Sequence, residues 1–166
     1  MDGRSQPGIP PGWRLRVEPE LPSTSDLLIR LAAAGEPEGL AVLARRQTAG
    51  RGQQGRSWRS PAGNLYVSVL LRPGRPAHEA PLFAILAAVA LAEALEPFLP
   101  DPSALRLKWP NDLLLGGAKL AGVLCESAAA EGRIEWIVLG CGANLAVAPQ
   151  VEGRATACLA GEGPAP

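Results

Sequence analysis

Short strand-like segments follow one another through the second half of this 166-residue chain, and this pattern restricts the fold more than any other feature. The pattern predicts strands there at residues 105–109, 113–115, 119–125 and 134–140. The first half adds predicted strands at 13–17, 40–44 and 64–71, and predicted helices at 27–34 and 78–96. Strands in series with helices at only two places favour an α+β fold, with a mixed, mostly antiparallel β-sheet covered by helices on one face.

Length and composition suit one globular domain with a sizeable core. A hydrophobic fraction of 47% and a charged fraction of 19% are ordinary for a soluble fold. Proline and glycine are frequent at both ends of the chain. We therefore expect a loose tail at 1–12, one domain at 13–160 and a second tail at 161–166.

Charge and cysteine usage argue against several kinds of partner and site. The formal net charge is zero, which gives no indication of a nucleic acid partner. No apolar run reaches the roughly 20 residues of a membrane span, and the N-terminus lacks the apolar stretch of a signal peptide. Cys125, Cys141 and Cys158 form no CxxC pair, so we expect neither disulfides nor a metal site built by the protein alone. These features favour a protein of the reducing cytoplasm with no membrane or nucleic acid partner.

The segment 50–55 reads Gly-Arg-Gly-Gln-Gln-Gly and matches the pattern of dinucleotide-binding loops. That motif requires a helix directly after the last glycine, because the helix N-terminus holds the pyrophosphate. Here Pro61 and Gly63 follow and break any helix, so the dinucleotide interpretation is rejected. Glycines interleaved with Arg51 and Arg56 suit an anionic ligand instead. The alternative is a mobile surface loop with solvated arginines.

Lysine is unusually rare in this chain. Fourteen of the 16 basic residues are arginine, and only Lys108 and Lys119 are lysine. An ammonium is a compact charge with three donors, whereas a guanidinium is a planar fork, so a tight site cannot exchange them. Both lysines are therefore candidates for a functional site, and chance in an arginine-rich sequence is the alternative.

Two further segments allow two interpretations each. Ser23-Thr24-Ser25 is either a helix-capping cluster or a hydrogen-bonding clamp for a ligand. Asn111-Asp112 follows the strand at 105–109 and suits either a turn or a ligand-binding strand end. Lys119 follows a Gly-Gly turn and could point to solvent or into a cleft. Taken singly, these segments do not decide between the alternatives.

Taken together and in order, the motifs resemble those of the biotin–protein ligase family. The resemblance covers about residues 13–160 and includes both lysines. It rests on the segments 23–25, 47–52, 55–58, 60–66, 108–113, 119–124 and 140–145. The combination of Ala-Gly-Arg-Gly, Lys-Trp-Pro-Asn-Asp and Lys-Leu-Ala-Gly is highly specific.

The resemblance implies an enzyme that joins biotin to ATP, forms biotinyl-5′-AMP and passes the biotinyl group to a lysine. The implied partner is the biotin carrier domain of a carboxylase, usually acetyl-CoA carboxylase. Mg²⁺ would accompany the ATP phosphates, and no protein-only metal cage is expected. An exposed strand could also pair two copies of the chain into a homodimer.

The resemblance also assigns site residues. The implied biotin site comprises Ser23, Thr24, Ser25, Gln47, Gly50, Arg51, Gly52, Gln53 and Lys119. The implied nucleotide site comprises Arg56, Trp58, Lys108, Asn111 and Asn144. Three residues would be catalytic: Lys119 near the biotin carboxylate and α-phosphate, Arg51 against the carboxylate or acyl phosphate, and Asp112 beside the incoming carrier lysine.

The chain departs from the family pattern in two respects. Gln53 stands where the family commonly has an arginine that helps to retain the adenylate. The chain also ends soon after residue 159, where family members usually continue with a helix and a small β-barrel. No N-terminal helix-turn-helix segment is present, so a DNA-binding repressor role is not expected. Two alternatives to an active ligase remain: a non-catalytic biotin- or adenylate-binding module, and a lipoate or octanoate transferase.

Overall fold

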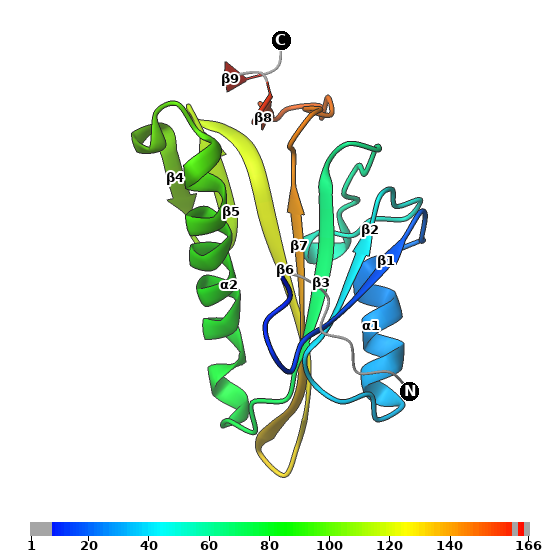
Figure 1. The fold of residues 1–166 in the computed structure, drawn as a ribbon. Coiled ribbons are helices and arrows are strands. Elements are labelled where there is room, and N and C mark those ends of the chain that lie inside the picture. The colour runs from blue at the N-terminus through cyan, green and yellow to red at the C-terminus, as the bar shows by residue number, and fades with distance from the viewer. Residues whose placement is uncertain (1–7, 161–162, 165–166) are drawn as a thin grey trace.

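The computed structural model describes residues 8–160 and 163–164. Its main element is a seven-stranded sheet with the order β1-β2-β3-β7-β6-β5-β4 (Figure 1). The strands are β1 (Arg14–Glu18), β2 (Leu40–Ala44), β3 (Leu65–Leu71), β4 (Leu105–Lys108), β5 (Asp112–Leu115), β6 (Ala118–Ala130) and β7 (Arg133–Ala143). Only β1 and β2 pair in parallel, and the other neighbours are antiparallel. The prediction of a mixed, mostly antiparallel sheet is confirmed.

Two α-helices and several short elements complete the described chain. The helices are α1 (Thr24–Ala33) and α2 (Ala80–Leu95). Four 3₁₀ turns accompany them: η1 (Gln53–Gly55), η2 (Ala77–Glu79), η3 (Glu96–Phe98) and η4 (Pro102–Ala104). A small two-stranded sheet is formed by β8 (Ala157–Cys158) and β9 (Gly163–Pro164).

Helix α1 begins three residues earlier than the apolar pattern predicts, because Ser23 caps it. The Ser23 hydroxyl accepts a hydrogen bond from the Asp26 N–H at 3.3 Å and so satisfies a free donor of the first turn. The β6–β7 hairpin is also longer than predicted. Its outer part contains Ala128–Ala130, which carry little intrinsic strand signal, and cross-strand pairing holds these residues in the sheet.

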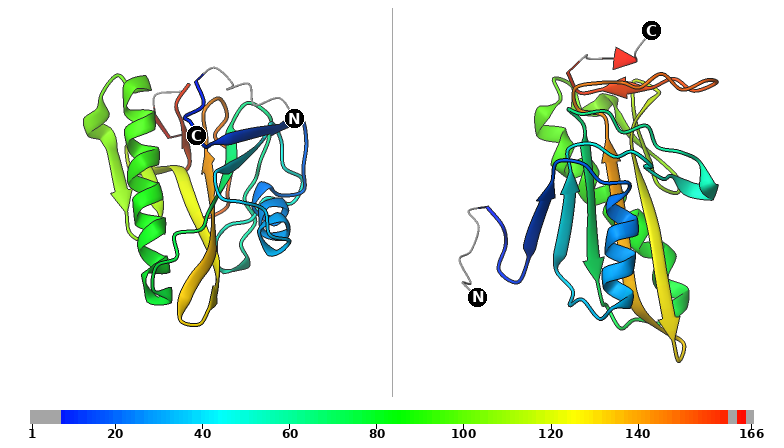
Figure 2. Two further views of the ribbon diagram at one scale, coloured as in Figure 1. Left: turned by 60° about the horizontal axis from the view of Figure 1, so that its bottom comes forward. Right: turned by 90° about the vertical axis from the view of Figure 1, so that its right-hand side faces the viewer.

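The two helices lie on opposite faces of the sheet, so the expectation of helices on one face was wrong (Figure 2). Neighbouring side chains of β3 show this, because successive residues of a strand point to opposite faces. Leu70 packs with Leu28 of α1, whereas Val69 packs in a cluster with Phe83 of α2. Strand β3 is apolar on both faces and needs cover on both. Hydrophobic periodicity reveals that need but not the side on which each helix lies.

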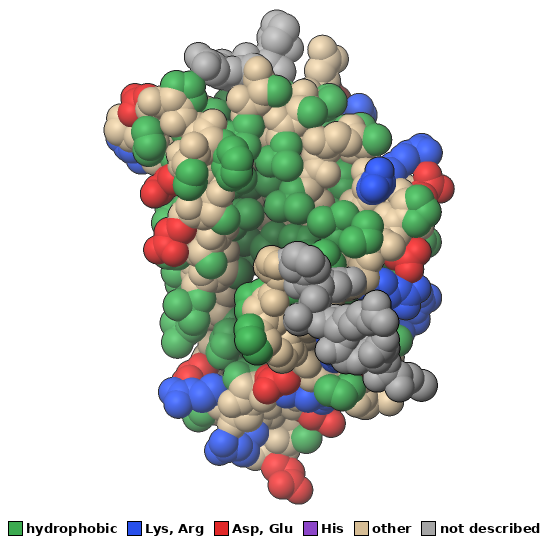
Figure 3. Space-filling model, viewed as in Figure 1, with side chains coloured by type: hydrophobic (Ala, Val, Ile, Leu, Met, Phe, Trp, Pro, Cys, Tyr) green, Lys and Arg blue, Asp and Glu red, His purple; other side chains and the backbone are tan. Residues whose placement is uncertain are grey.

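Helix α2 supplies the largest core cluster and also presents apolar residues outward. Ala88, Leu91 and Leu95 are buried against β4–β7, whereas Leu82 and Leu86 are 53% and 61% exposed. Figure 3 shows hydrophobic side chains gathered beside α2 on the face seen in Figure 1. By length and composition alone, the segment Ala77–Phe98 could cross a membrane, with a mean hydropathy of 1.7. Packing against the sheet accounts for the apolar character of its inner side.

Candidate functional site

A pocket of about 950 Å³ opens on the sheet face that carries α1. It is formed by the N-terminus of α1, the loop after β2, the β4–β5 turn and the central strands β6 and β7. Of the residues expected in the site from the sequence, all but Gly50 line this pocket. The lining members of that set are Ser23, Thr24, Ser25, Gln47, Arg51, Gly52, Gln53, Arg56, Trp58, Lys108, Asn111, Asp112, Lys119 and Asn144.

The pocket floor is backbone, because three glycines of β6 and β7 face it. Gly122 pairs across the strands with Gly142, and Gly140 follows two residues away on the same face. A Cβ at Gly142 would lie 2.7 Å from the Trp58 Nε1, and a Cβ at Gly140 would collide with the Ser25 hydroxyl. Larger residues would therefore displace the side chains that line the pocket. Apart from their presence in family motifs, nothing in the sequence distinguishes these glycines from the others.

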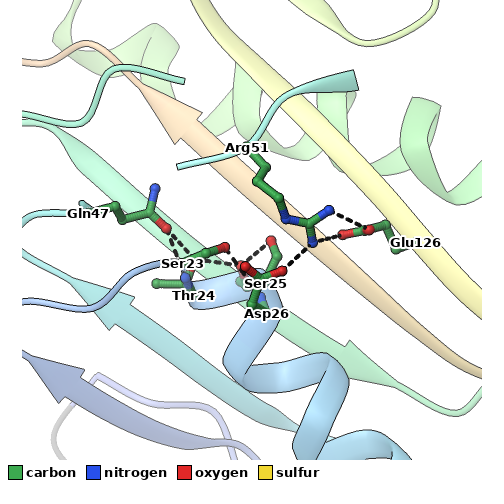
Figure 4. A network of polar contacts seen from close by, with 8 residues as sticks. Ser23, Thr24, Ser25, Asp26, Gln47, Arg51 and Glu126 are labelled. Carbon is green, nitrogen blue, oxygen red and sulfur yellow. Dashed lines mark hydrogen bonds and ion pairs between the residues drawn. The ribbon is translucent and has the colours of Figure 1, made fainter. Parts of the chain in front are cut away.

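A cluster of neutral polar groups lies at the α1 end of the pocket (Figure 4). The Gln47 Oε1 accepts hydrogen bonds from the Thr24 backbone N–H at 2.8 Å and from its hydroxyl at 3.2 Å. The Ser68 hydroxyl on β3 lies 2.7 Å from the Thr24 hydroxyl and 3.0 Å from the Ser25 hydroxyl. Gln47 Nε2 donates to Ser60 at 3.0 Å. This polar cluster of Thr24, Ser25, Gln47, Ser60 and Ser68 offers donors and acceptors fixed by one another.

The capping interpretation of Ser23-Thr24-Ser25 is confirmed for Ser23, and the ligand-clamp interpretation stays a prediction. Ser23 caps α1, whereas Thr24 and Ser25 turn their hydroxyls to the polar cluster. Ser60 and Ser68 were not expected from the sequence; they do not line the pocket but form hydrogen bonds with Gln47, Thr24 and Ser25, which do. The available signal was the position of Ser68 in the alternating segment 64–71, in phase with Tyr66 and Leu70. In the structure Ser68 is fully buried, which requires a hydrogen-bond partner for its hydroxyl.

A close ion pair occupies the other end of the pocket. The Lys119 Nζ lies 2.6 Å from the Asp112 Oδ1, and the two side chains are only 13% and 17% exposed. Burial lowers the pKa of Lys119, partly offset by Asp112, while Arg154 and Arg56 lower it further. The ammonium also lies 5.2 Å from the ring centre of Trp58. Lys119 is thus a poorly solvated cation available to an anionic group.

The ion pair and the polar cluster lie two residues apart along β6. A Cβ at Gly122 would lie 3.3 Å from both the Lys119 Nζ and the Asp112 Oδ1, so the ion pair lies at the level of Gly122. The polar cluster lies at the level of Gly140, which pairs with Leu124 and Ser68. Leu124 stands two residues beyond Gly122 on β6, or about 7 Å along an extended strand. The pocket can therefore hold a ligand with a neutral polar head at one end and an anion at the other.

Arg51 makes contacts that the sequence did not predict. Its guanidinium bonds to both oxygens of Glu126, at 2.9 and 2.7 Å, and lies 2.6 Å from Asp26. The hydrogen bond with Glu126 is the largest cause of the raised pKa of Arg51. Sequence reasoning missed both carboxylates. Arg51 and Glu126 are 75 positions apart in the chain. The one available signal was the charge of Glu126, which directly follows the apolar strand predicted at 119–125.

The asparagines hold the loops around the pocket. The Asn144 amide, 2% exposed, donates to the Ala157 carbonyl at 3.0 Å, and the Asn111 amide donates to the Val123 carbonyl at 2.5 Å. Gly50 lies behind the lining, where a Cβ would lie 2.5 Å from both the Ser60 hydroxyl and the Trp58 carbonyl. Gly50 thus permits a close approach of two loop segments. The predicted nucleotide roles of Asn111 and Asn144 stay predictions.

Metal-binding groups are sparse in the described chain. Residues 8–160 and 163–164 contain no cluster of three or more His, Cys, Asp or Glu side chains that could hold an ion. The pocket lining includes two carboxylate residues, Asp112 and Glu152, and Asp112 is engaged by Lys119. These donors fit a hard cation that arrives with phosphate ligands of its own better than a resident ion.

Comparison with known proteins identifies the family. The model of the Biotin/lipoate A/B protein ligase family matches residues 19–144, which include both ends of the pocket. The chain belongs to this family. The biotin–[acetyl-CoA-carboxylase] ligase of Mycobacterium tuberculosis is 37% identical over 161 residues, covering 92% of this chain and 58% of that protein. The ligase of the same name from Paracoccus denitrificans is 45% identical over 108 residues, covering 65% and 45% of the two chains.

Solved structures agree with the family assignment. A biotin protein ligase from Leishmania major, in complex with biotinyl-5-AMP, matches with a TM-score of 0.76 and 30% identity. The match covers 90% of this chain and 64% of that one. A ligase from Aquifex aeolicus with biotin and ATP matches with a TM-score of 0.66 and 34% identity, over 84% and 55% of the two chains. The chain spans about half the length of the curated relatives that it matches.

Proposed function

We propose that this chain activates biotin with ATP to biotinyl-5′-AMP and transfers the biotinyl group to a lysine of a biotin carrier domain. The observation that carries the proposal is the two-ended pocket. Its polar cluster suits the neutral, hydrogen-bonding ring system of biotin, and Lys119 suits the carboxylate at the end of the biotin side chain. The relatives from Leishmania and Aquifex were solved with biotinyl-5-AMP and with biotin and ATP, which supports the same ligands here.

In the first step, a biotin carboxylate oxygen attacks the α-phosphorus of ATP, and pyrophosphate leaves. Negative charge accumulates on the phosphorus oxygens in the transition state, and the Lys119 ammonium offsets it in a site of reduced solvation. Arg56 and Arg154 line the same pocket and can bind phosphate oxygens. Mg²⁺ is expected as the counter-ion of the ATP phosphates and would neutralise part of their charge.

In the second step, the amine of the carrier lysine attacks the acyl carbonyl of biotinyl-5′-AMP. An amide bond forms, the acyl–oxygen bond to AMP breaks, and the amine loses a proton. Asp112 lines the pocket, and we assign it as the carboxylate that accepts this proton. It is bonded to Lys119 in the free protein, so release of Lys119 toward the phosphate would make Asp112 available.

The partner follows from the relatives that are named biotin–[acetyl-CoA-carboxylase] ligases, and the carrier domain of such a carboxylase is the proposed acceptor. Pairing of two copies, residence in the cytoplasm and the absence of membrane or nucleic acid partners stay predictions from the sequence.

One assay tests the proposal: the protein is incubated with labelled biotin, Mg·ATP and a carrier domain. A ligase releases pyrophosphate in a biotin-dependent manner and labels the carrier. Pyrophosphate release without carrier labelling would reduce the proposal to the first half-reaction. Biotin binding with neither activity would indicate a binding module, and use of lipoate instead of biotin would contradict the proposal.

A further inference from the structure

Protein carboxylates hold the terminal nitrogens of Arg51 at the α1 end of the pocket (Figure 4). Glu126 of β6 accepts from both Nη1 and Nη2, and Asp26 in the first turn of α1 lies 2.6 Å from Nη2. Two parallel bonds between a guanidinium and a carboxylate fix the plane of the guanidinium as well as its position. The contacts thereby connect the loop after β2 to a helix and to a central strand.

Glu126 and Asp26 stand behind Arg51 and do not line the pocket themselves. Arg51 is a lining residue, whereas neither carboxylate residue is. A ligand in the pocket therefore meets Arg51 but not its two partners. The three charges sum to minus one, so this arginine attracts an anion less strongly than an unpaired arginine would. The anionic end of a ligand is favoured at Lys119 instead, which carries one carboxylate partner.

Arg51 has two N–H donors left over, the second N–H of Nη1 and the Nε–H. Its Nε is buried and has no hydrogen-bond acceptor within the part of the chain that the structure describes. A buried donor without an acceptor is costly, so this N–H is a strong candidate for a contact with a ligand. Because both terminal nitrogens already bind carboxylates, the Nε–H suits a neutral acceptor such as a carbonyl oxygen.

We propose that Glu126 and Asp26 are positioning residues, which hold Arg51 so that its Nε–H is presented to a neutral acceptor on the head group of the substrate. The identity of that substrate as biotin rests on the proposed function. The same contacts restrain the 50–56 loop, which continues to Trp58, over the pocket. Loss of Glu126 should thus speed ligand release and leave the chemical step nearly unchanged, because that step takes place at the Lys119 end.

The test compares three variants: Glu126→Gln, Asp26→Asn and, as a matched control, Glu79→Gln. Glu79 forms a similar two-bond pair with Arg75, at 2.8 and 3.2 Å, away from the pocket. Biotin affinity and off-rate, and kcat for pyrophosphate release at saturating biotin, are measured for each. Glu126→Gln should weaken biotin binding about tenfold, mainly through a faster off-rate, with kcat within about twofold of the wild type. Asp26→Asn should have a smaller effect, and Glu79→Gln should have none.

A ligand-free measurement separates this inference from the proposed function. Trypsin cleaves after arginine, and both Arg51 and Arg56 lie in the restrained loop. Glu126→Gln should accelerate cleavage at these two sites in the free protein, and Glu79→Gln should not. If the wild type fails to bind biotin, the proposed function fails, and the cleavage rates still decide whether Glu126 restrains the loop.

The positioning role is overturned if Glu126→Gln leaves both the biotin affinity and the cleavage rates within twofold of the wild type. It is also overturned if kcat falls as much as affinity does, because a merely structural defect would lower both. Should Glu126→Gln fail to fold, Glu126→Asp provides the second variant. It keeps the charge on a shorter side chain and should show an intermediate loss of affinity, whereas wild-type affinity in this variant would contradict the proposal.

Discussion

Replacement of Lys119 by glutamine is the perturbation that tests the pocket chemistry most sharply. The variant removes the ammonium that lies 2.6 Å from Asp112 and leaves that carboxylate only 17% exposed without its cation. Breaking a fully buried pair costs about 3–5 kcal/mol, and an exposed pair is worth about 0–1 kcal/mol. This pair lies between those limits, and glutamine can still donate to Asp112, so we expect a loss of about 1–2 kcal/mol in the free energy of unfolding.

The effect on catalysis should be larger than the effect on stability. Lys119 is proposed to offset charge that develops only in the transition state of adenylate formation, and removal of one such group typically costs about 10²- to 10³-fold in rate. The assay is biotin-dependent pyrophosphate release at saturating biotin and ATP, with thermal unfolding measured on the same samples. Lys119→Arg is the matched control for charge. It should recover stability better than activity, since a planar fork does not replace a compact ammonium.

A rate within twofold of the wild type in the Lys119→Gln variant would refute this reasoning. A loss of activity that simply follows a loss of folded protein at the assay temperature would refute it as well. Asp112→Asn completes a double-mutant cycle with Lys119→Gln. The cycle should show coupling in the unfolding free energy, because the two residues are in direct contact.

Three further predictions concern other parts of the pocket. Because burial lowers the pKa of Lys119, the rate of pyrophosphate release should fall as the pH rises through a value below the ordinary 10.5 of lysine. Between the lowered pKa of Lys119 in the folded protein and the ordinary value of 10.5, the unfolded state holds more protons than the folded state. The contribution of this group to the unfolding free energy should therefore rise with pH while activity falls. A loss of activity that begins only at or above pH 10.5 would contradict this prediction. Gly142→Ala should displace Trp58, raise the KM for ATP and lower the free energy of unfolding by about 1–3 kcal/mol. An unchanged KM and an unchanged unfolding free energy would show that the indole has room to move. Gln53→Arg should slow the release of biotinyl-5′-AMP about tenfold by adding a charge-assisted contact, and an unchanged off-rate would remove Gln53 as the cause of weak retention.

Much of the fold could be predicted from the sequence, because local patterns determine it. Alternation within residues 64–71 and the apolar run at 78–96 predicted β3 and α2 closely. The faces on which the two helices pack could not be predicted, since β3 is apolar on both sides. The length of the β6–β7 hairpin was underestimated because alanine contributes little strand propensity, and pairing between strands decides the matter.

The candidate site could be predicted where residues belong to contiguous motifs. Gln47, Asp112 and Lys119 were expected in the site, and the structure brings them into one pocket. The partners of Thr24, Ser25 and Arg51 were missed. Ser68 and Glu126 act through contacts with residues more than 40 positions away, and such contacts arise from strand order and register, which no local pattern encodes. The tendency of hydroxyl and carboxyl groups to pair when buried explains these contacts once the topology is known.

A crystal structure of the protein with biotin would show directly which end of the pocket holds each end of the ligand. We expect the ring system of biotin within hydrogen-bonding distance of the polar cluster of Thr24, Ser25, Gln47, Ser60 and Ser68, and its carboxylate beside the Lys119 Nζ. We also expect Glu126 to hold Arg51 in the complex as it does in the free protein. Biotin bound in the reverse orientation, with its carboxylate at Arg51, or bound outside this pocket, would contradict the proposed binding mode.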